Sequence, residues 1–114
     1  MKTVLTHKQS QRLFDVGVPK EAASIKTHAS ALFTLTDLLK LLPTTLDVDN
    51  DKYLLKIEGD NCSEDYWVSY YHYKRFDGNI MPMSLWACAD SELINVLYRA
   101  VFWYYEFYLI AIKK

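Results

Sequence analysis

The chain has 114 residues, of which 51% are hydrophobic and 24% are charged, and its formal net charge is -1. These values exclude a disordered polypeptide, and the near-zero charge gives no electrostatic reason to expect a polyanion as partner. The length fits a single domain, residues 1–114, that can bury its own hydrophobic core.

The cysteine content and the first residues indicate the compartment. Cys62 and Cys88 are too few for a disulfide scaffold in a domain that has its own core, so we expect reduced thiols. The opening "MKTVLTHKQSQR" lacks the apolar segment of a signal peptide. We therefore expect a cytoplasmic protein.

Two short helices are predicted near the N-terminus. Thr6 can cap a helix that runs to Val16, and Gln9, three residues later, can complete a capping box. Gly17 suits the left-handed position that follows a helix C-terminus. The segment "PKEAASIKTHA", which starts at Pro19, predicts a second, weakly amphipathic helix.

The segment "FTLTDLLKLLP" contains the clearest helix start. Thr34 as N-cap and Asp37 three residues later form a capping box, and Phe33 can pack against Leu38. Pro43 ends the helix, because a residue that precedes proline is disfavoured in α geometry.

From Thr44 to Trp86 the pattern changes to β-rich segments separated by turn residues. "TTLDV" and "YLLKIEG" flank "DND", "YWVSYYHY" follows "GDNCSED", and "IMPMSLW" follows "DGN". Turns this short permit only an antiparallel meander. Pro82 fits best on an edge strand or at a bulge, since it has no N–H.

An aromatic helix is predicted from about Asp90, as N-cap, to the end of the chain. Glu106 interrupts its apolar run, and the uncharged stretches on either side together span roughly 20 Å at 1.5 Å per residue. A bilayer core needs about 30 Å, so we do not expect this helix to cross a membrane. The predicted fold class is α+β, with short N-terminal helices, a small antiparallel meander sheet of three to four strands, and a long aromatic C-terminal helix.

The C-terminal helix is apolar on nearly every side. Placed at 100° per residue, it has one narrow polar stripe, formed by Glu92, Asn95, Arg99, Glu106 and Lys113. Its rings are either core or an interface with another protein. The predicted contact residues are Trp103, Tyr104, Phe107 and Tyr108, with Arg99 and Glu106 at the polar rim. The function that we predict is association with another protein, and the candidate partners are a second copy of the chain and a phage or host protein.

The acidic segment "DVDNDKYLLKIE" matches part of an EF-hand. Asp47, Asp49, Asp51 and Glu58 take positions 1, 3, 5 and 12 of such a calcium-binding loop. Lys52 occupies position 6, where the loop requires glycine, and the residues after it indicate a strand. We interpret residues 47–58 as an acidic hairpin, and calcium binding stays open.

Nucleic-acid binding is the alternative function. "SQRLFDVGVPKEAAS" resembles part of a helix-turn-helix with its turn at Gly17, so residues 12–28 could place Arg12, Lys20 and Lys26 against phosphates. Arg12 and Lys26 also stand where that motif expects apolar residues. Two short helices joined by a Gly-Pro turn are the structural alternative.

No residue pattern supports a metal site, a cofactor or catalysis. The candidate metal ligands never occur at close spacing: Cys62, Cys88, His7, His28 and His72. Neither a nucleophile motif nor a glycine-rich phosphate loop is present. "YWVSYYHYKRF" could stack bases, although such segments more commonly pair rings across strands. We expect that the protein is not an enzyme and that it binds no metal, no cofactor and no small-molecule ligand.

Three segments together, "SQRLFDVGVPKEAAS", "LFTLTDLLKLLP" and "ELINVLY", resemble a group of small uncharacterised proteins carried by prophages and mobile elements of gut anaerobic bacteria. The resemblance covers three helices in the same order and so spans most of the chain. It implies a bacterial or phage cytoplasmic setting, leaves the function open and transfers no site residue.

Overall fold

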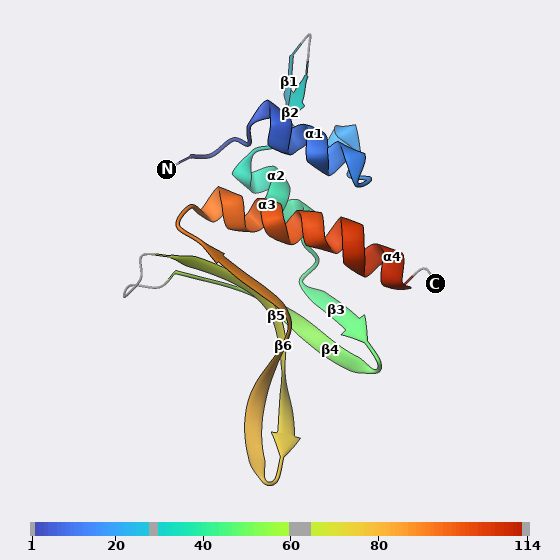
Figure 1. The fold of residues 1–114 in the computed structure, drawn as a ribbon, viewed down its shortest axis with the longest axis vertical. Coiled ribbons are helices and arrows are strands. Elements are labelled where there is room, and N and C mark those ends of the chain that lie inside the picture. The colour runs from blue at the N-terminus through green and yellow to red at the C-terminus, as the bar shows by residue number, and fades with distance from the viewer. Residues whose placement is uncertain (1, 28–29, 60–64, 113–114) are drawn as a thin grey trace. The chain divides into compact units, whose positions relative to one another are not determined.

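The computed structural model describes residues 2–27, 30–59 and 65–112, and it confirms the α+β fold class. The chain divides into two compact units, one that combines Met1–Leu42 with Glu92–Lys114 and one that comprises Pro43–Ser91. We call them the helical unit and the sheet unit. Figure 1 shows the helices of the first and the long strands of the second.

Helix α1 (His7–Asp15) begins and ends as the sequence predicts. The N–H of Gln9 donates to Oγ1 of Thr6 at 3.1 Å, and the N–H of Thr6 donates to Oε1 of Gln9 at 3.1 Å, which completes the capping box. After the helix, Gly17 takes the predicted left-handed conformation, with φ of 109°.

The helix predicted over "PKEAASIKTHA" is wrong. Lys20–Ala22 form a single 3₁₀ turn, and the chain then enters a two-stranded hairpin of β1 (Ile25–Lys26) and β2 (Ala31–Leu32). The physical reason lies at Ser24, whose N–H and hydroxyl both donate to Oδ2 of Asp37, at 2.9 and 2.8 Å. The backbone donor that a continuing helix needs is therefore bonded elsewhere.

Helix α2 (Leu35–Leu41) starts at the predicted capping box and ends before Pro43, as predicted. The N–H of Thr34 donates to Oδ2 of Asp37 at 2.9 Å, so this oxygen accepts three hydrogen bonds in all, two of them from Ser24. Asp37 is only 8% exposed. Burial acts to raise the pKa of this carboxyl, but the bonds from Thr34 and Ser24 outweigh it and leave the pKa below its usual value.

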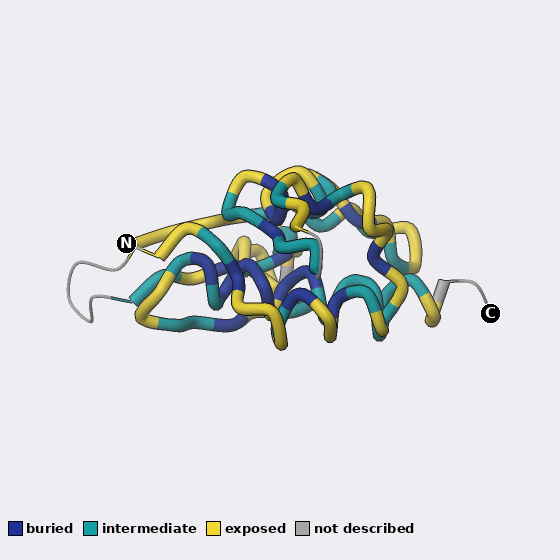
Figure 2. The backbone as a smooth tube through the Cα atoms, turned by 90° about the horizontal axis from the view of Figure 1, so that it is seen from above, coloured by how far each residue is buried: buried dark blue, intermediate teal, exposed yellow. Residues whose placement is uncertain are grey.

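The core of the helical unit gathers around α3 (Leu93–Trp103). Helices α1 and α2 both pack against α3, and Nε2 of Gln9 donates to Oδ1 of Asn95 at 3.3 Å. The ring of Phe33, which is fully buried, lies 5.1 Å from the ring of Phe14. Figure 2 shows buried positions alternating with exposed ones along the helices. The buried residues of α3 are Ile94, Val96, Leu97, Tyr98, Ala100 and Val101.

The C-terminal helix begins later than predicted. Asp90 is the last residue of a strand and pairs with Tyr66, so it does not cap the helix, and Glu92 takes the N-cap position. The pairing of Asp90 with Tyr66 keeps Asp90 in the strand and prevents it from acting as the N-cap. Beyond α3, the helix continues through a π-helical turn, Tyr104–Tyr108, into α4 (Leu109–Ile112), which confirms the long aromatic C-terminal helix.

The sheet unit is the predicted antiparallel meander. Its strands lie in the order β3-β4-β5-β6, with bounds Thr45–Val48, Asp51–Gly59, Tyr66–Phe76 and Asn79–Asp90. Both two-residue turns have positive φ at each residue, 50° and 70° at Asp49 and Asn50, and 50° and 80° at Asp77 and Gly78. This is the geometry of a type I′ hairpin, which Asp, Asn and Gly adopt at low cost.

Strands β5 and β6 extend beyond the rest of the sheet as a two-stranded ribbon (Figure 1). Strand β4 pairs with β5 only as far as Tyr71, and a β-bulge between Tyr70 and Tyr71 interrupts the β5–β6 register at the same point. We call residues 72–83 the arm. Pro82 lies in the arm on β6, which is an edge strand, as predicted.

Replacement of Asp37 by asparagine should destabilise the fold. The free energy of unfolding at pH 7 should fall by about 1–3 kcal/mol, because three donors lose a charged acceptor. Since the folded-state pKa of Asp37 is lowered, its contribution is present above the unfolded pKa and is lost as the pH falls through the folded pKa. Urea unfolding followed by circular dichroism at several pH values measures both effects.

The matched control is Asp15→Asn, which changes an exposed carboxylate on α1 and should cost less than about 0.5 kcal/mol. A difference between wild type and Asp37→Asn that stayed constant on acidification to about pH 2 would contradict the assignment.

Tyr98 should tolerate loss of its hydroxyl. The residue is 8% exposed, and its hydroxyl has no hydrogen-bond partner among the described residues. Tyr98→Phe should therefore leave the free energy of unfolding unchanged or raise it by up to about 1 kcal/mol. In Tyr70→Phe, by contrast, a fully buried hydroxyl that donates to the Pro43 carbonyl at 2.8 Å is lost, and stability should fall by about 1 kcal/mol. Equal losses in the two variants would contradict the prediction.

Candidate functional site

The aromatic residues predicted as a contact surface lie at a π-helical turn. Trp103 and Tyr108 are five residues apart, which would place them about 140° apart around an ideal α-helix. Their ring centroids nevertheless lie 6.0 Å apart, and Tyr104 stacks on Tyr108 at 5.4 Å with an interplanar angle of 19°. The π turn thus gathers three of the four predicted aromatic residues into one cluster.

The exposed side of this helix differs from the predicted polar stripe. Phe107 and Ile110 are 58% and 52% exposed, whereas Glu106 is half-buried. Arg99 of the predicted stripe is exposed, and the π turn rotates the side chains that follow it relative to a straight α-helix. Lys113 lies outside the described residues. No glycine or proline in this segment signals the π turn in the sequence.

The cluster is uncharged at neutral pH. Burial raises the pKa of Tyr104 and of Tyr105, and the neighbouring phenols of Tyr105 and Tyr108 add to the rise at Tyr104. The rings of Tyr104 and Tyr105 meet edge to face at 5.4 Å. The three clustered rings at Trp103, Tyr104 and Tyr108 are half-buried, so α3 is core whereas the π turn keeps part of its aromatic surface open to solvent.

The basic residues predicted to contact nucleic acid do not share one site. Arg12 places its guanidinium over the ring of Phe102, 5.1 Å from the centroid. Lys20 and Lys26 together line a pocket to which Arg12 does not contribute. The helix-turn-helix scaffold predicted for residues 12–28 is wrong, because its second helix is replaced by a 3₁₀ turn and a strand.

The acidic segment forms a hairpin, as the sequence indicates. Residues 47–58 belong to β3, the turn and β4, and Oδ2 of Asp51 lies 3.9 Å from Nε2 of His72. In the part of the chain that the structure describes, no three His, Cys, Asp or Glu side chains are placed to hold a metal ion. Cys62 and His28 lie outside that part, and Cys88 is buried.

The arm is an apolar surface that the sequence did not reveal. Four large side chains on it are strongly exposed: Tyr73 at 56%, Ile80 at 64%, Met81 at 53% and Met83 at 48%. The sequence signal for the arm was the length of the two β-rich segments on either side of "DGN". Both segments are longer than β3 and longer than the part of β4 that pairs with β5. Where β5 and β6 extend beyond the end of the β4–β5 pairing, no neighbouring strand of the described sheet lies beside the ribbon.

Strand pairing assigns these side chains to two faces of the arm. One face combines Tyr73 and Ile80 with Arg75, which pairs with Ile80. The opposite face combines Met81 and Met83 with their partners Lys74 and His72. Each face therefore carries apolar surface beside a cation, and the described charges of the arm include one carboxylate, at Asp77.

The outer edge of the arm is unsuited to the addition of another strand. The residues that flank a two-residue turn form a hydrogen-bonded pair, and the pairs alternate from there. Counting from Phe76 and Asn79, Tyr73 and Pro82 form a non-hydrogen-bonded pair, so the nitrogen of Pro82 faces the free edge. Because that nitrogen has no hydrogen, a partner would contact the faces of the arm rather than extend the sheet.

Comparison of the chain with models of protein families, with curated proteins and with solved structures finds no match. The resemblance to phage and mobile-element proteins stays a prediction. Among the described residues, no helix is long and apolar enough to cross a membrane.

Proposed function

We propose that the protein acts by associating with a second copy of itself, as a homodimer, and that it catalyses no reaction. The observation that carries this proposal is the arm, on which four large apolar side chains are exposed. A two-stranded ribbon is only marginally stable in water by itself, and full burial of one such side chain contributes about 1.5–3 kcal/mol. Contact at the arm would remove this surface from water and support the ribbon.

Charge favours a second copy as the occupant. Lys74 and Arg75 on the arm are exposed, and neither forms an ion pair with a described residue. The β3–β4 hairpin of the same sheet unit carries exposed Asp47, in β3, and exposed Asp49, in the turn. Each copy thus offers a basic and an acidic surface, and the formal net charge of -1 keeps repulsion between copies small.

The C-terminal helix offers the alternative surface for association. The aromatic cluster at Trp103, Tyr104 and Tyr108 lies beside exposed Phe107 and Ile110. Tyrosine suits an interface, since its ring adds buried area and its hydroxyl tolerates water. The resemblance found in the sequence supports an accessory role in a bacterial cytoplasm, in a phage or mobile-element setting.

Two matched substitutions separate the surfaces. Ile80→Asp changes the arm and Ile110→Asp changes the C-terminal helix, at side chains that are 64% and 52% exposed. We expect the mass of the wild type in solution to rise with concentration. Ile80→Asp should weaken association about tenfold or more, because a carboxylate replaces apolar surface that the contact between two copies would bury. Ile110→Asp should leave association within about threefold of the wild type. Multi-angle light scattering over a concentration series measures both.

Circular dichroism and thermal unfolding check that both variants stay folded. A wild type that has the mass of one chain at every concentration would overturn self-association. Loss of association in Ile110→Asp but not in Ile80→Asp would move the contact to the C-terminal helix and refute the assignment to the arm.

A further inference from the structure

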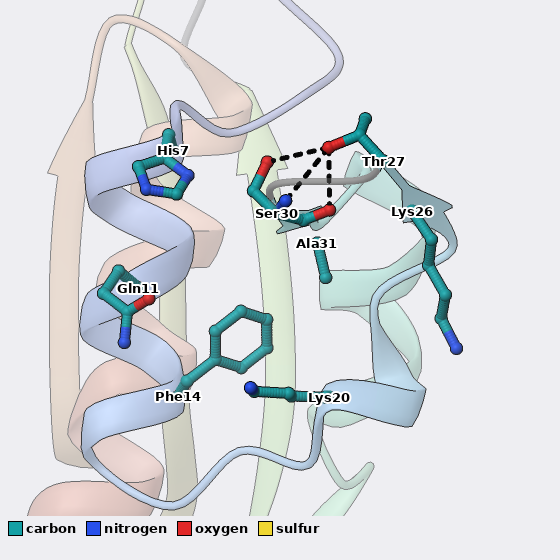
Figure 3. A pocket seen from close by; sticks show the side chains of 8 residues that line it. All are labelled: His7, Gln11, Phe14, Lys20, Lys26, Thr27, Ser30 and Ala31. Carbon is teal, nitrogen blue, oxygen red and sulfur yellow. Dashed lines mark hydrogen bonds between the residues drawn. The ribbon is translucent and has the colours of Figure 1, made fainter.

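A pocket of about 410 Å³ lies in the helical unit, between α1 and the β1–β2 hairpin (Figure 3). Helix α1 contributes His7, Gln11 and Phe14 to one wall. Lys20 extends from the 3₁₀ turn toward the ring of Phe14, whereas Lys26, on β1, directs its amine away from that ring. The volume falls within the range of about 300–1,000 Å³ that is usual for small-molecule sites.

The pocket has an uncompensated positive charge. Neither Lys20 nor Lys26 forms an ion pair with any residue that the structure describes, and no carboxylate is among the residues that line the pocket. Glu21, the neighbour of Lys20, lines a different pocket beside α2. The ammonium group of Lys20 thus lies at the pocket without an anion from the described residues, which favours a ligand that supplies negative charge.

The wall that faces α1 is held in place by hydrogen bonds. Thr27 and Ser30 close the hairpin turn, with the N–H of Thr27 donating to the Ser30 carbonyl at 2.8 Å and the N–H of Ser30 donating to Oγ1 of Thr27 at 3.0 Å. At its base, Ser24 and Thr34 are both bonded to Asp37. A wall fixed in this way loses little conformational entropy when a ligand binds.

The floor of the pocket is aromatic. The ring of Phe14 is half-buried and packs against fully buried Phe33 at 5.1 Å. One side of the Phe14 ring is therefore anchored in the core, and Figure 3 shows the ring projecting into the pocket beside the amine of Lys20. A flat ligand group could stack there while an anionic group reaches the amine of Lys20.

We propose that this pocket binds a phosphate monoester that carries a flat ring, of the class of nucleoside monophosphates. A phosphate monoester carries a charge of about -1.5 to -2 at pH 7, part of which the ammonium group of Lys20 would neutralise. Lysine binds phosphate as a point charge, and the imidazole of His7 and the hydroxyl of Ser30 offer further hydrogen bonds at the rim. The proposal is independent of self-association, because the pocket lies wholly in the helical unit.

The test is calorimetric titration of the full chain with four probes: AMP, ribose 5-phosphate, inorganic phosphate and adenosine. AMP should bind saturably, with a dissociation constant about tenfold or more below those of the other three, because only AMP supplies both the ring and the dianion. Chemical-shift changes in an NMR titration with AMP should concentrate in α1, the 3₁₀ turn and the hairpin.

Substitutions then assign the binding to the pocket. Lys20→Gln should weaken AMP binding about tenfold, and Phe14→Leu should reduce the preference for AMP over ribose 5-phosphate while leaving ribose 5-phosphate binding nearly unchanged. Lys8→Gln is the matched control, since Lys8 is exposed on α1 and does not line the pocket. Absence of saturable AMP binding up to about 10 mM would overturn the proposal. Equal weakening in Lys8→Gln and Lys20→Gln would also overturn it.

Discussion

The helical unit depends on one carboxylate oxygen, Oδ2 of Asp37, which accepts hydrogen bonds from Ser24 and Thr34. These two residues flank the β1–β2 hairpin along the chain, so a single side chain joins the base of the hairpin to the start of α2. Charged acceptors make stronger hydrogen bonds than neutral ones, and near-burial protects these bonds from water. The same bonds divert Ser24 from a helix, and the hairpin that results forms one wall of the basic pocket.

The sheet unit has a different constraint, which is the unequal length of its strands. Type I′ turns fix the register of both hairpins, and this register leaves the end of the β5–β6 hairpin without a neighbouring strand. A ribbon has two faces and two edges but no second layer of its own to cover them. Pro82 removes a donor from one edge, so the exposed Tyr73, Ile80 and Met81 are the surface available for contact.

Much of the local structure could be predicted because its causes are local. Two capping boxes, at Thr6 and Thr34, and the turn at Asp77–Gly78 act within four residues, and all three have the expected geometry. The prediction of a helix after Pro19 was wrong because the N–H of Ser24, which that helix would need, donates instead to Asp37, 13 residues away in sequence. The π turn, the pairing of Asp90 and the arm likewise depend on distant pairing or on packing, which periodicity does not encode. Trp103, Tyr104 and Tyr108 form one cluster, and their role as a contact surface stays a prediction.

The central claim is that the wild-type protein contacts a second copy through its arm, and amide hydrogen exchange tests that claim without any substitution. Exchange is measured at two protein concentrations, one at which the protein is a monomer and one at which it is associated. The account predicts that amides of residues 72–76, 79–81 and 83 exchange more slowly at the higher concentration, because contact suppresses local opening of the ribbon, while amides of α2 are unchanged. Equal exchange rates of the arm at both concentrations, or slowing confined to Tyr104–Tyr108 and the residues after it, would contradict the account.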